Sequence, residues 1–184
     1  MRAVSDRNLL DVFVEDFSKI LERHCRYIIV SGYVAISHGR SRGTEDVDVI
    51  IERITLRKFM QLHKDLLKSG LECIQPGTPT ELYNHYLLEK TSIRYVKKGT
   101  LVPDMELKLA RDKLDEYQLR HRVKLPLTET DVYFSTPETN IAFKEEYLKT
   151  DKDLEDAKHL RIIYESKLDE KEIDKIKKMI KGRR

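Results

Sequence analysis

The spacing of apolar and polar positions predicts helices and strands mixed along the first part of the chain. Apolar residues recur every three or four positions over 8–24, as they do along one face of an amphipathic helix. A short β-branched run at 27–30 and an alternating segment at 46–52 predict two strands. One or two helical turns are expected between them at 33–38, and a second amphipathic helix at 55–69.

Beyond Gly70 the pattern is first rich in strands and then wholly helical. Pro103 indicates an edge strand, because proline cannot donate to a sheet ladder. The segment 80–89 fits neither the helical nor the strand period clearly. The remaining strands are expected at 71–75, 92–96, 102–109, 123–125 and 132–134, and the remaining helices at 111–122, 136–148, 151–166 and 170–181. Together these elements predict an α/β fold: a mixed twisted sheet with flanking helices and a helical carboxyl-terminal part.

The length favours a single compact unit. A chain of 184 residues can bury one real core but is short for two large independent domains. We expect a sheet domain over 1–134 and a carboxyl-terminal helical segment over 135–184 packed on it, because strands cease near Ser135. The sequence contains no internal repeat.

Composition excludes two broad classes of protein. Hydrophobic residues make up 40% of the chain, and no apolar stretch approaches the roughly 20 residues that cross a bilayer. The amino terminus lacks the apolar core of a secretory signal, so we expect a cytoplasmic protein with no membrane partner. Cys25 and Cys73 are too few for a disulfide framework and lack metal-site spacing, which indicates two reduced core residues.

The net charge of +3 is concentrated at the carboxyl terminus. Segment 167–184 carries eight basic and four acidic residues, or +4, so the preceding chain carries about −1. Such a segment can contact a phosphate backbone, but it can equally be a solvated helix end, where cations are favoured.

The candidate chemistry lies where a strand ends in Ser31-Gly32 and the next begins with Asp46-Val47-Asp48. Residues two apart on a strand face the same side, with Cα atoms about 6.5–7 Å apart, so both carboxylates can turn toward one hard cation. A glycine after a strand lets backbone N–H groups approach a phosphate. Taken alone, an Asp-x-Asp strand is more often a solvated face than a metal site.

These residues carry a family resemblance. The run Ser31-Gly32-Tyr33-Val34-Ala35, with His38-Gly39 and then Arg42-Gly43-Thr44-Glu45-Asp46-Val47-Asp48, resembles the polymerase-beta-like nucleotidyltransferase superfamily. Within it the run is similar to a small stand-alone prokaryotic branch that includes abortive-infection toxin nucleotidyltransferases. Ser31 stands where that branch usually has its first glycine. The resemblance implies a minimal nucleotidyltransferase fold and a site that holds Mg²⁺ or Mn²⁺ on Asp46, Asp48 and a third carboxylate.

The third carboxylate is expected on the strand at 102–107. Asp104 and Glu106 share one face of that strand. Asp104 suits the spacing of the resembled family, whereas Glu106 is flanked by apolar residues and fits the strand pattern better. We favour Asp104 as metal ligand and as a base. The helical block resembles the same branch, which implies that Lys144 and Asp153 complete the site. The implied nucleotide-binding residues are Ser31, Gly32, Arg42, Thr44, Lys144 and Asp153.

Three of the implied nucleotide contacts have a plainer alternative. Lys144 can be an ordinary surface lysine. Asp153 can stabilise a helix amino terminus, and Arg42 can belong to an exposed basic loop.

The resemblance implies transfer of a nucleoside monophosphate from an NTP, such as ATP, to an acceptor hydroxyl with release of pyrophosphate. The acceptor could be tRNA or another RNA, a protein or a small molecule. A toxin-type enzyme with an antitoxin partner is a narrower version. The alternative is a non-catalytic module of the same fold that binds nucleotide, RNA or a partner protein.

Overall fold

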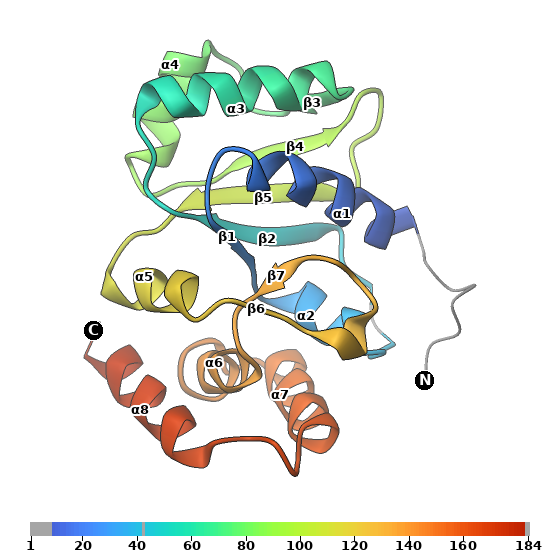
Figure 1. Ribbon diagram of the computed structural model, residues 1–184, viewed down its shortest axis with the longest axis vertical. Helices are drawn as coiled ribbons and strands as arrows, with labels where there is room; N and C mark the ends of the chain where they lie inside the picture. The colour runs from blue at the N-terminus through green and yellow to red at the C-terminus, as the bar shows by residue number, and fades with distance from the viewer. Residues whose placement is uncertain (1–8, 42, 183–184) are drawn as a thin grey trace.

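The computed structural model describes residues 9–41 and 43–182. A seven-stranded sheet in the order β3-β4-β5-β2-β1-β7-β6 forms its centre (Figure 1). Strand β2 runs antiparallel to β1 and parallel to β5, so the sheet is mixed. Helices lie on either side of the sheet, and the chain ends in helices alone. The expected fold class is confirmed.

The elements follow the expected order. The strands are β1 (Tyr27–Ile29), β2 (Asp46–Ile51), β3 (Leu71–Cys73), β4 (Ile93–Lys97), β5 (Asp104–Leu109), β6 (Val123–Lys124) and β7 (Tyr133–Phe134). The α-helices are α1 (Leu9–Glu22), α2 (Gly32–Ser37), α3 (Leu56–Lys68), α4 (Pro79–Glu81), α5 (Lys113–Arg120), α6 (Pro137–Phe143), α7 (Asp151–Ile163) and α8 (Glu170–Lys181). Two π-helical turns, η2 (Leu82–Leu87) and η4 (Lys144–Leu148), and a 3₁₀ turn, η3 (Pro126–Thr128), complete them.

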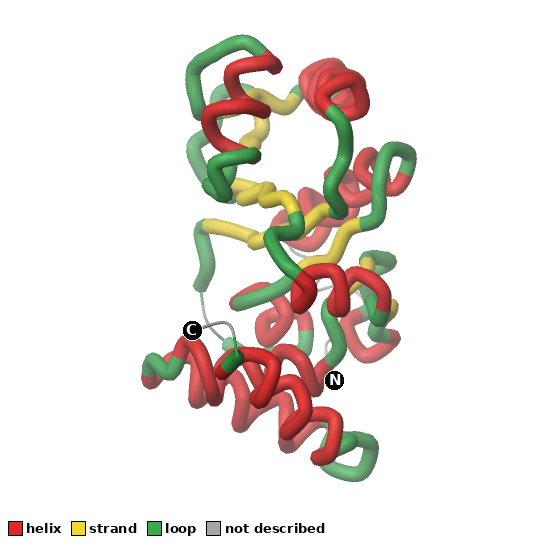
Figure 2. Tube along the Cα trace, turned by 90° about the vertical axis from the view of Figure 1, so that its left-hand side faces the viewer, coloured by secondary structure: helices red, strands yellow, loops and turns green. Residues whose placement is uncertain are grey.

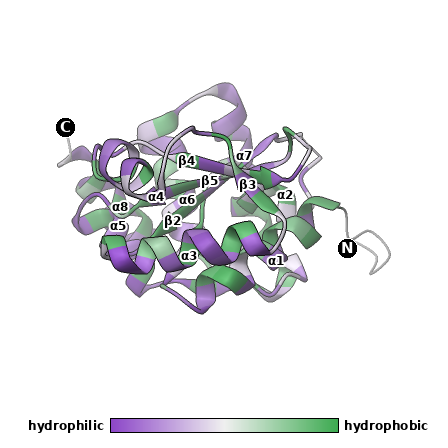
Figure 3. Cartoon of the chain, turned by 90° about the horizontal axis from the view of Figure 1, so that it is seen from above, coloured by the Kyte–Doolittle hydropathy of each residue, from purple (hydrophilic) through white to green (hydrophobic). Residues whose placement is uncertain are grey.

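Threonine side chains set the starts of three helices. The hydroxyl oxygens of Thr55, Thr136 and Thr150 accept hydrogen bonds from backbone N–H groups in the first turns of α3, α6 and α7. Each bond satisfies a donor that has no partner within its helix. Beyond its cap, α3 carries hydrophilic and hydrophobic residues in turn along its length (Figure 3). Local sequence therefore fixes where these helices begin.

The alternation in β2 separates the core from the candidate site. Val47, Val49 and Ile51 are fully buried in the main hydrophobic core. Phe17 of α1 and Phe59 of α3 belong to the same core cluster. The other face of β2 carries the two aspartates and Ile50, which are only partly buried. One strand thus anchors the core with one face and presents carboxylates with the other.

Two expectations about strands require correction. Strand β5 lies between β4 and β2 inside the sheet, so the edge position inferred from Pro103 is wrong. Pro103 precedes the first residue of β5, where its missing N–H interrupts no ladder. Strand β3 ends at Cys73, two residues earlier than expected. Residues 80–87 of the segment that fitted neither period are helical and form the end of α4 and η2.

The last three helices gather at one end of the molecule, away from α3 and α4 (Figures 1 and 2). Helix α8 buries Ile173, Ile176 and Ile180. The ammonium of Lys177 lies 2.6 Å from a carboxylate oxygen of Glu145 in η4. Part of the basic charge of the carboxyl-terminal segment is therefore paired within the protein.

Both cysteines are free thiols, Cys25 buried and Cys73 partly buried. Across the described ranges, the helices are too short or too polar to cross a bilayer.

Candidate active site

Two neighbouring parallel strands bring four carboxylates to one face of the sheet. In the register of β2 and β5, Asp46 lies opposite Asp104 and Asp48 lies opposite Glu106. Because alternate residues of a strand face the same side, all four side chains point away from the main core. The structure thus brings Asp46, Asp48, Asp104 and Glu106 together on one face of the sheet.

Asp104 is the most buried of these carboxylates, with 4% of its surface exposed. No described group donates a hydrogen bond to its Oδ1 atom. Burial raises the pKa of Asp104 to about 6; Arg94 opposes this rise, while Asp46 and Glu106 add to it. A buried carboxylate with an unsatisfied oxygen is costly unless a ligand completes it. The Oδ1 atom of Asp104 is therefore available to contact a ligand.

Glu106 is engaged by two cations. Lys108 Nζ lies 2.7 Å from its Oε1 atom, and Arg94 Nη2 lies 3.0 Å from its Oε2 atom. Burial acts to raise the pKa of Glu106, but Lys108, Ser92 and Arg94 together outweigh it, so the pKa is lowered. The same Lys108 Nζ lies 2.7 Å from Asp48 Oδ1. Between the two candidates for third carboxylate, the contacts favour Asp104.

Sequence reasoning missed Lys108 and Arg94. The signal for Lys108 was present, because residues 104, 106 and 108 share one strand face by simple alternation. Arg94 gave no local signal, since only the pairing of β4 with β5 sets it opposite Glu106.

The carboxylates fit a hard divalent cation in type, since Mg²⁺ and Mn²⁺ prefer oxygen ligands. The orphaned Asp104 Oδ1 also fits such a ligand. As the side chains lie, no three acidic, histidine or cysteine side chains of the described residues gather closely enough to hold a metal ion. The donor set is thus suitable in type, although its side chains do not converge on one point.

Thr44 is directed at Asp46. Its hydroxyl donates to the backbone oxygen of Asp46 at 2.9 Å and to Asp46 Oδ1 at 3.1 Å. Arg42, the expected basic residue of the same loop, lies outside the described residues. The loop before β2 thus orients the first aspartate of the pair.

The turn between β1 and α2 has a conformation suited to glycine, yet it holds Ser31. Ser31 has φ 65° and ψ −136°, and its side chain makes no capping hydrogen bond. L-residues rarely adopt positive φ, and such strain costs about 1–3 kcal/mol. The buried Gly32 follows at the start of α2. Ser31 therefore occupies a strained backbone conformation.

We expect Ser31→Gly to stabilise the fold by about 1 kcal/mol, since relief of strain outweighs the greater chain entropy of glycine. Thermal unfolding should show a rise in Tm of about 2–4 °C. Ser31→Ala is the matched control, because it removes the hydroxyl and keeps the positive φ. A Tm for Ser31→Gly at or below that of Ser31→Ala would contradict the assignment of strain.

A cavity of about 540 Å³ lies between the sheet and the carboxyl-terminal helices. The sheet side contributes Ser31, Asp48 and Lys108, and the start of α5 contributes further polar groups. On the far side stand Lys144 and Tyr147 of η4. The remaining described lining residues are Val30, Ile50, Arg111, Asp112, Asp115, Gln118, Asn140, Phe143 and Leu148. The cavity is thus lined by Asp48 of β2 and by two expected nucleotide contacts, Ser31 and Lys144.

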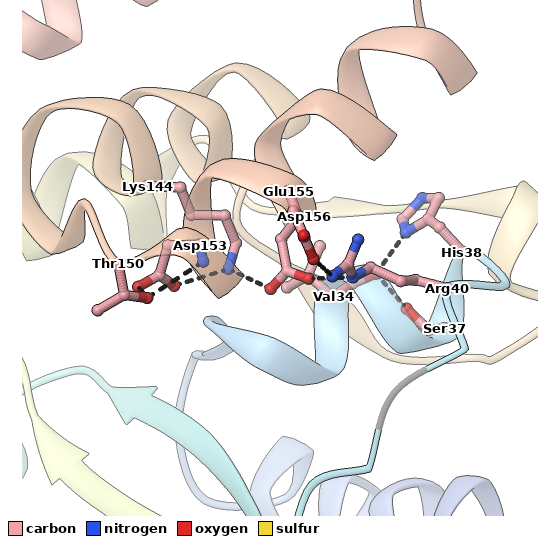
Figure 4. A network of polar contacts seen from close by, with 9 residues as sticks. All are labelled: Val34, Ser37, His38, Arg40, Lys144, Thr150, Asp153, Glu155 and Asp156. Carbon is pink, nitrogen blue, oxygen red and sulfur yellow. Dashed lines mark hydrogen bonds and ion pairs between the residues drawn. The ribbon is translucent and has the colours of Figure 1, made fainter.

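Lys144 is a buried lysine, 1% exposed, so the surface alternative is wrong. Its Nζ lies 2.8 Å from Asp156 Oδ2 and 3.4 Å from Asp153 Oδ1 (Figure 4). Asp156 is fully buried, and its Oδ1 lies 2.6 Å from Nε of Arg40. Arg40, in the loop that leads to β2, is thereby tied to α7 and, through Asp156, to Lys144.

Asp153 has two local roles. Its backbone N–H donates to Thr150 Oγ1, which caps α7, and its carboxylate accepts from the same hydroxyl. The carboxylate also contacts Lys144. The capping alternative is thus correct, and the contact with Lys144 accompanies it. Asp156, which sequence reasoning missed, makes the shorter contact with Lys144.

Comparison with known proteins points to one fold. No protein-family model matches the sequence, and no curated protein matches it. A crystal structure of an antigenic nucleotidyltransferase-like protein from Paracoccidioides brasiliensis is similar, with a TM-score of 0.55 and 20% identity over 95% of this chain and 88% of that chain. The solution structure of the antibiotic-resistance factor ANT(2'')-Ia is also similar, with a TM-score of 0.56 and 10% identity over 95% of this chain and 92% of that chain. At these identities the likeness concerns the fold. The chain has a nucleotidyltransferase-like fold.

Proposed function

We propose that this protein is a metal-dependent nucleotidyltransferase. The observation that carries the proposal is the carboxylate set of two adjacent parallel strands beside a cavity that also holds Ser31 and Lys144. Asp46, Asp48 and Asp104 are the residues that would hold one or two Mg²⁺ or Mn²⁺ ions. Such ions, when bound, neutralise triphosphate charge and favour an oxygen nucleophile. The nucleotidyltransferase-like fold supports this assignment.

Different residues of the chain would bind the triphosphate, orient a metal ligand and accept the proton. Ser31 and Lys144, which both line the cavity, would bind the triphosphate from its two sides, Ser31 through its backbone and Lys144 through its ammonium. Thr44 orients Asp46. An acceptor hydroxyl oxygen forms a bond to the α-phosphorus, the bond from that phosphorus to the β-bridging oxygen breaks, and pyrophosphate leaves. Asp104 accepts the hydroxyl proton as general base.

The proposal is tested by pyrophosphate release from each of the four NTPs with Mg²⁺ or Mn²⁺, with and without total RNA and cell extract. We expect release with one preferred NTP, and none from the Asp46→Asn/Asp48→Asn double variant. The labelled product identifies the acceptor as tRNA, another RNA, a protein or a small molecule. Release that persists in the folded double variant would overturn the metal assignment.

Asp48→Asn alone should lower the transfer rate by about a thousandfold, because a direct metal contact supplies several kcal/mol in the transition state. Steady-state pyrophosphate release measures the loss, and thermal unfolding verifies that the variant folds. The control is Asp131→Asn, which neutralises an exposed aspartate paired with Lys124 outside the site. Transfer by Asp48→Asn within about tenfold of the wild type would contradict the role of Asp48.

A second candidate is a non-catalytic nucleotide-binding module. It is motivated by the strained Ser31 and by the ion pairs that already occupy Asp48 and Glu106. Nucleotide binding without pyrophosphate release under every condition would favour it. Metal-dependent release with any acceptor would reject it.

A toxin-type enzyme with an antitoxin partner is a narrower form of the first proposal. Induced expression of the wild type should then arrest growth of a bacterial host. Asp48→Asn, expressed to the same level, should not.

A further inference from the structure

Lys108 is a cation placed inside the carboxylate set of the site. It lies two residues after Glu106 on β5 and opposite Ile50 on β2, so it shares the face of Asp48 and Glu106. Its Nζ atom is 2.7 Å from Asp48 Oδ1 and 2.7 Å from Glu106 Oε1. One ammonium therefore bridges the two strands that carry the proposed metal ligands.

The lysine is also within reach of a ligand. Lys108 and Asp48 both line the cavity, and 21% of the Lys108 side chain is exposed. Its long stem lets the ammonium turn toward a new partner without movement of the strand. An anion that enters the cavity can thus meet the ammonium directly.

Movement of the Lys108 ammonium away from the site would affect Asp48 and Glu106 differently. Glu106 keeps a second ion pair, with Arg94 Nη2 at 3.0 Å. Asp48 gains an unengaged oxygen at Oδ1, the atom that Lys108 contacts. Departure of Lys108 therefore leaves Glu106 paired and makes Asp48 available.

We propose that Lys108 is a resident counter-ion of Asp48 that makes divalent-cation binding depend on the nucleoside triphosphate. A divalent cation at Asp48 would meet the ammonium at close range, and like charges repel strongly at a partly buried site. Triphosphate oxygens offer the ammonium another partner and so free Asp48. Cation and triphosphate should then bind with positive coupling. The inference rests on the proposed function, since it assigns Asp48 to a cation.

The test measures Mn²⁺ bound by the protein in equilibrium dialysis at matched free Mn²⁺. The samples are the wild type, two neutral variants, Lys108→Met and Lys108→Gln, and Lys108→Arg, which keeps the charge. The matched control is Lys124→Met, because Lys124 forms an ion pair of similar length, 2.6 Å, with Asp131 away from the site. Each is dialysed alone and with a mixture of the four non-hydrolysable α,β-methylene nucleoside triphosphates.

Without triphosphate, we expect the neutral variants to bind Mn²⁺ about tenfold more tightly than the wild type, Lys108→Arg or Lys124→Met. Triphosphate should raise the Mn²⁺ affinity of the wild type and raise that of the neutral variants by a smaller factor. Equal triphosphate-free affinity in wild type and neutral variants would overturn the inference, and it would leave the proposed function intact if pyrophosphate is released. Absence of bound Mn²⁺ in every sample, triphosphate included, would overturn both.

Discussion

Asp104→Asn is expected to inactivate the protein and at the same time to stabilise its fold. The side chain is buried, and one carboxylate oxygen has no hydrogen-bond donor among the described groups. Burial raises the pKa of Asp104 from 3.8 to about 6. The folded protein therefore holds the proton more tightly than the unfolded chain does. A neutral amide of nearly the same shape removes the cost of burying the charge.

The sign of the pH dependence follows from that raised pKa. Well below pH 3.8 the group is protonated in both states and costs nothing. As the pH rises from 3.8 to about 6, the unfolded chain ionises first and the free energy of unfolding falls. Above that range the cost is complete, and we put it at about 1–3 kcal/mol. The stabilisation by Asp104→Asn should thus be present near neutral pH and vanish in acid.

Urea unfolding in the presence of a chelator measures this effect at about pH 7.5 and about pH 3. We expect the midpoint of Asp104→Asn to exceed that of the wild type only at the higher pH, together with a loss of transfer of about a thousandfold. Asp131→Asn is the control, because the pKa of that exposed carboxyl is lowered by Lys124 and its neutralisation should not stabilise the fold. An Asp104→Asn protein that is less stable than the wild type near neutral pH, or fully active, would refute the assignment.

Lys144→Met is expected to destabilise the fold by about 3–5 kcal/mol. Lys144 and Asp156 are almost entirely buried and lie 2.8 Å apart. Removal of the ammonium leaves a carboxylate that is excluded from water and held by Arg40 at 2.6 Å. Losing one partner of a buried pair costs far more than losing both.

A double-mutant cycle measures this coupling. Lys144→Met/Asp156→Asn should be more stable than the sum of the single changes predicts, with a coupling of about 1 kcal/mol or more. Lys152→Met is the matched control, because this lysine of α7 is exposed and its replacement should change the unfolding free energy by less than about 0.5 kcal/mol. A cost below about 1 kcal/mol for Lys144→Met would show that the buried pair contributes little. Below the Tm of the variant, the KM for the NTP should also rise, since Lys144 lines the cavity.

The two predictions concern different parts of the fold: Asp104 lies on the sheet, whereas Lys144 lies in the helical part and lines the cavity. The sheet supplies carboxylates, one of them unsatisfied, while the helical part supplies a buried lysine whose charge is already balanced. Arg40 joins the two parts through Asp156 (Figure 4). The loop before the Asp46-x-Asp48 strand is therefore linked to the helix that holds Lys144 in place.

Local sequence determined where the helices and strands of this protein lie and which side of each strand is buried. The two-residue period of 46–51 alone put Asp46 and Asp48 on one side and Val47 and Val49 on the other. Threonine caps located the starts of α3, α6 and α7, because a cap needs only the N–H groups of its own first turn. The family resemblance, carried by short motifs, indicated the fold that the structural comparisons support.

Only the tertiary structure decided which charges meet. The ion pair of Glu106 with Arg94 depends on β4, which sets the two residues opposite each other across the sheet. The buried Lys144 pairs with Asp156, 12 residues later in the chain. Asp156 in turn pairs with Arg40, which lies 116 residues before it. The interior position of β5 likewise follows from its pairing with β2 and β4, which Pro103 could not reveal. Periodicity and capping act within a few residues, whereas burial and ion pairing depend on neighbours that the chain brings together only when it folds.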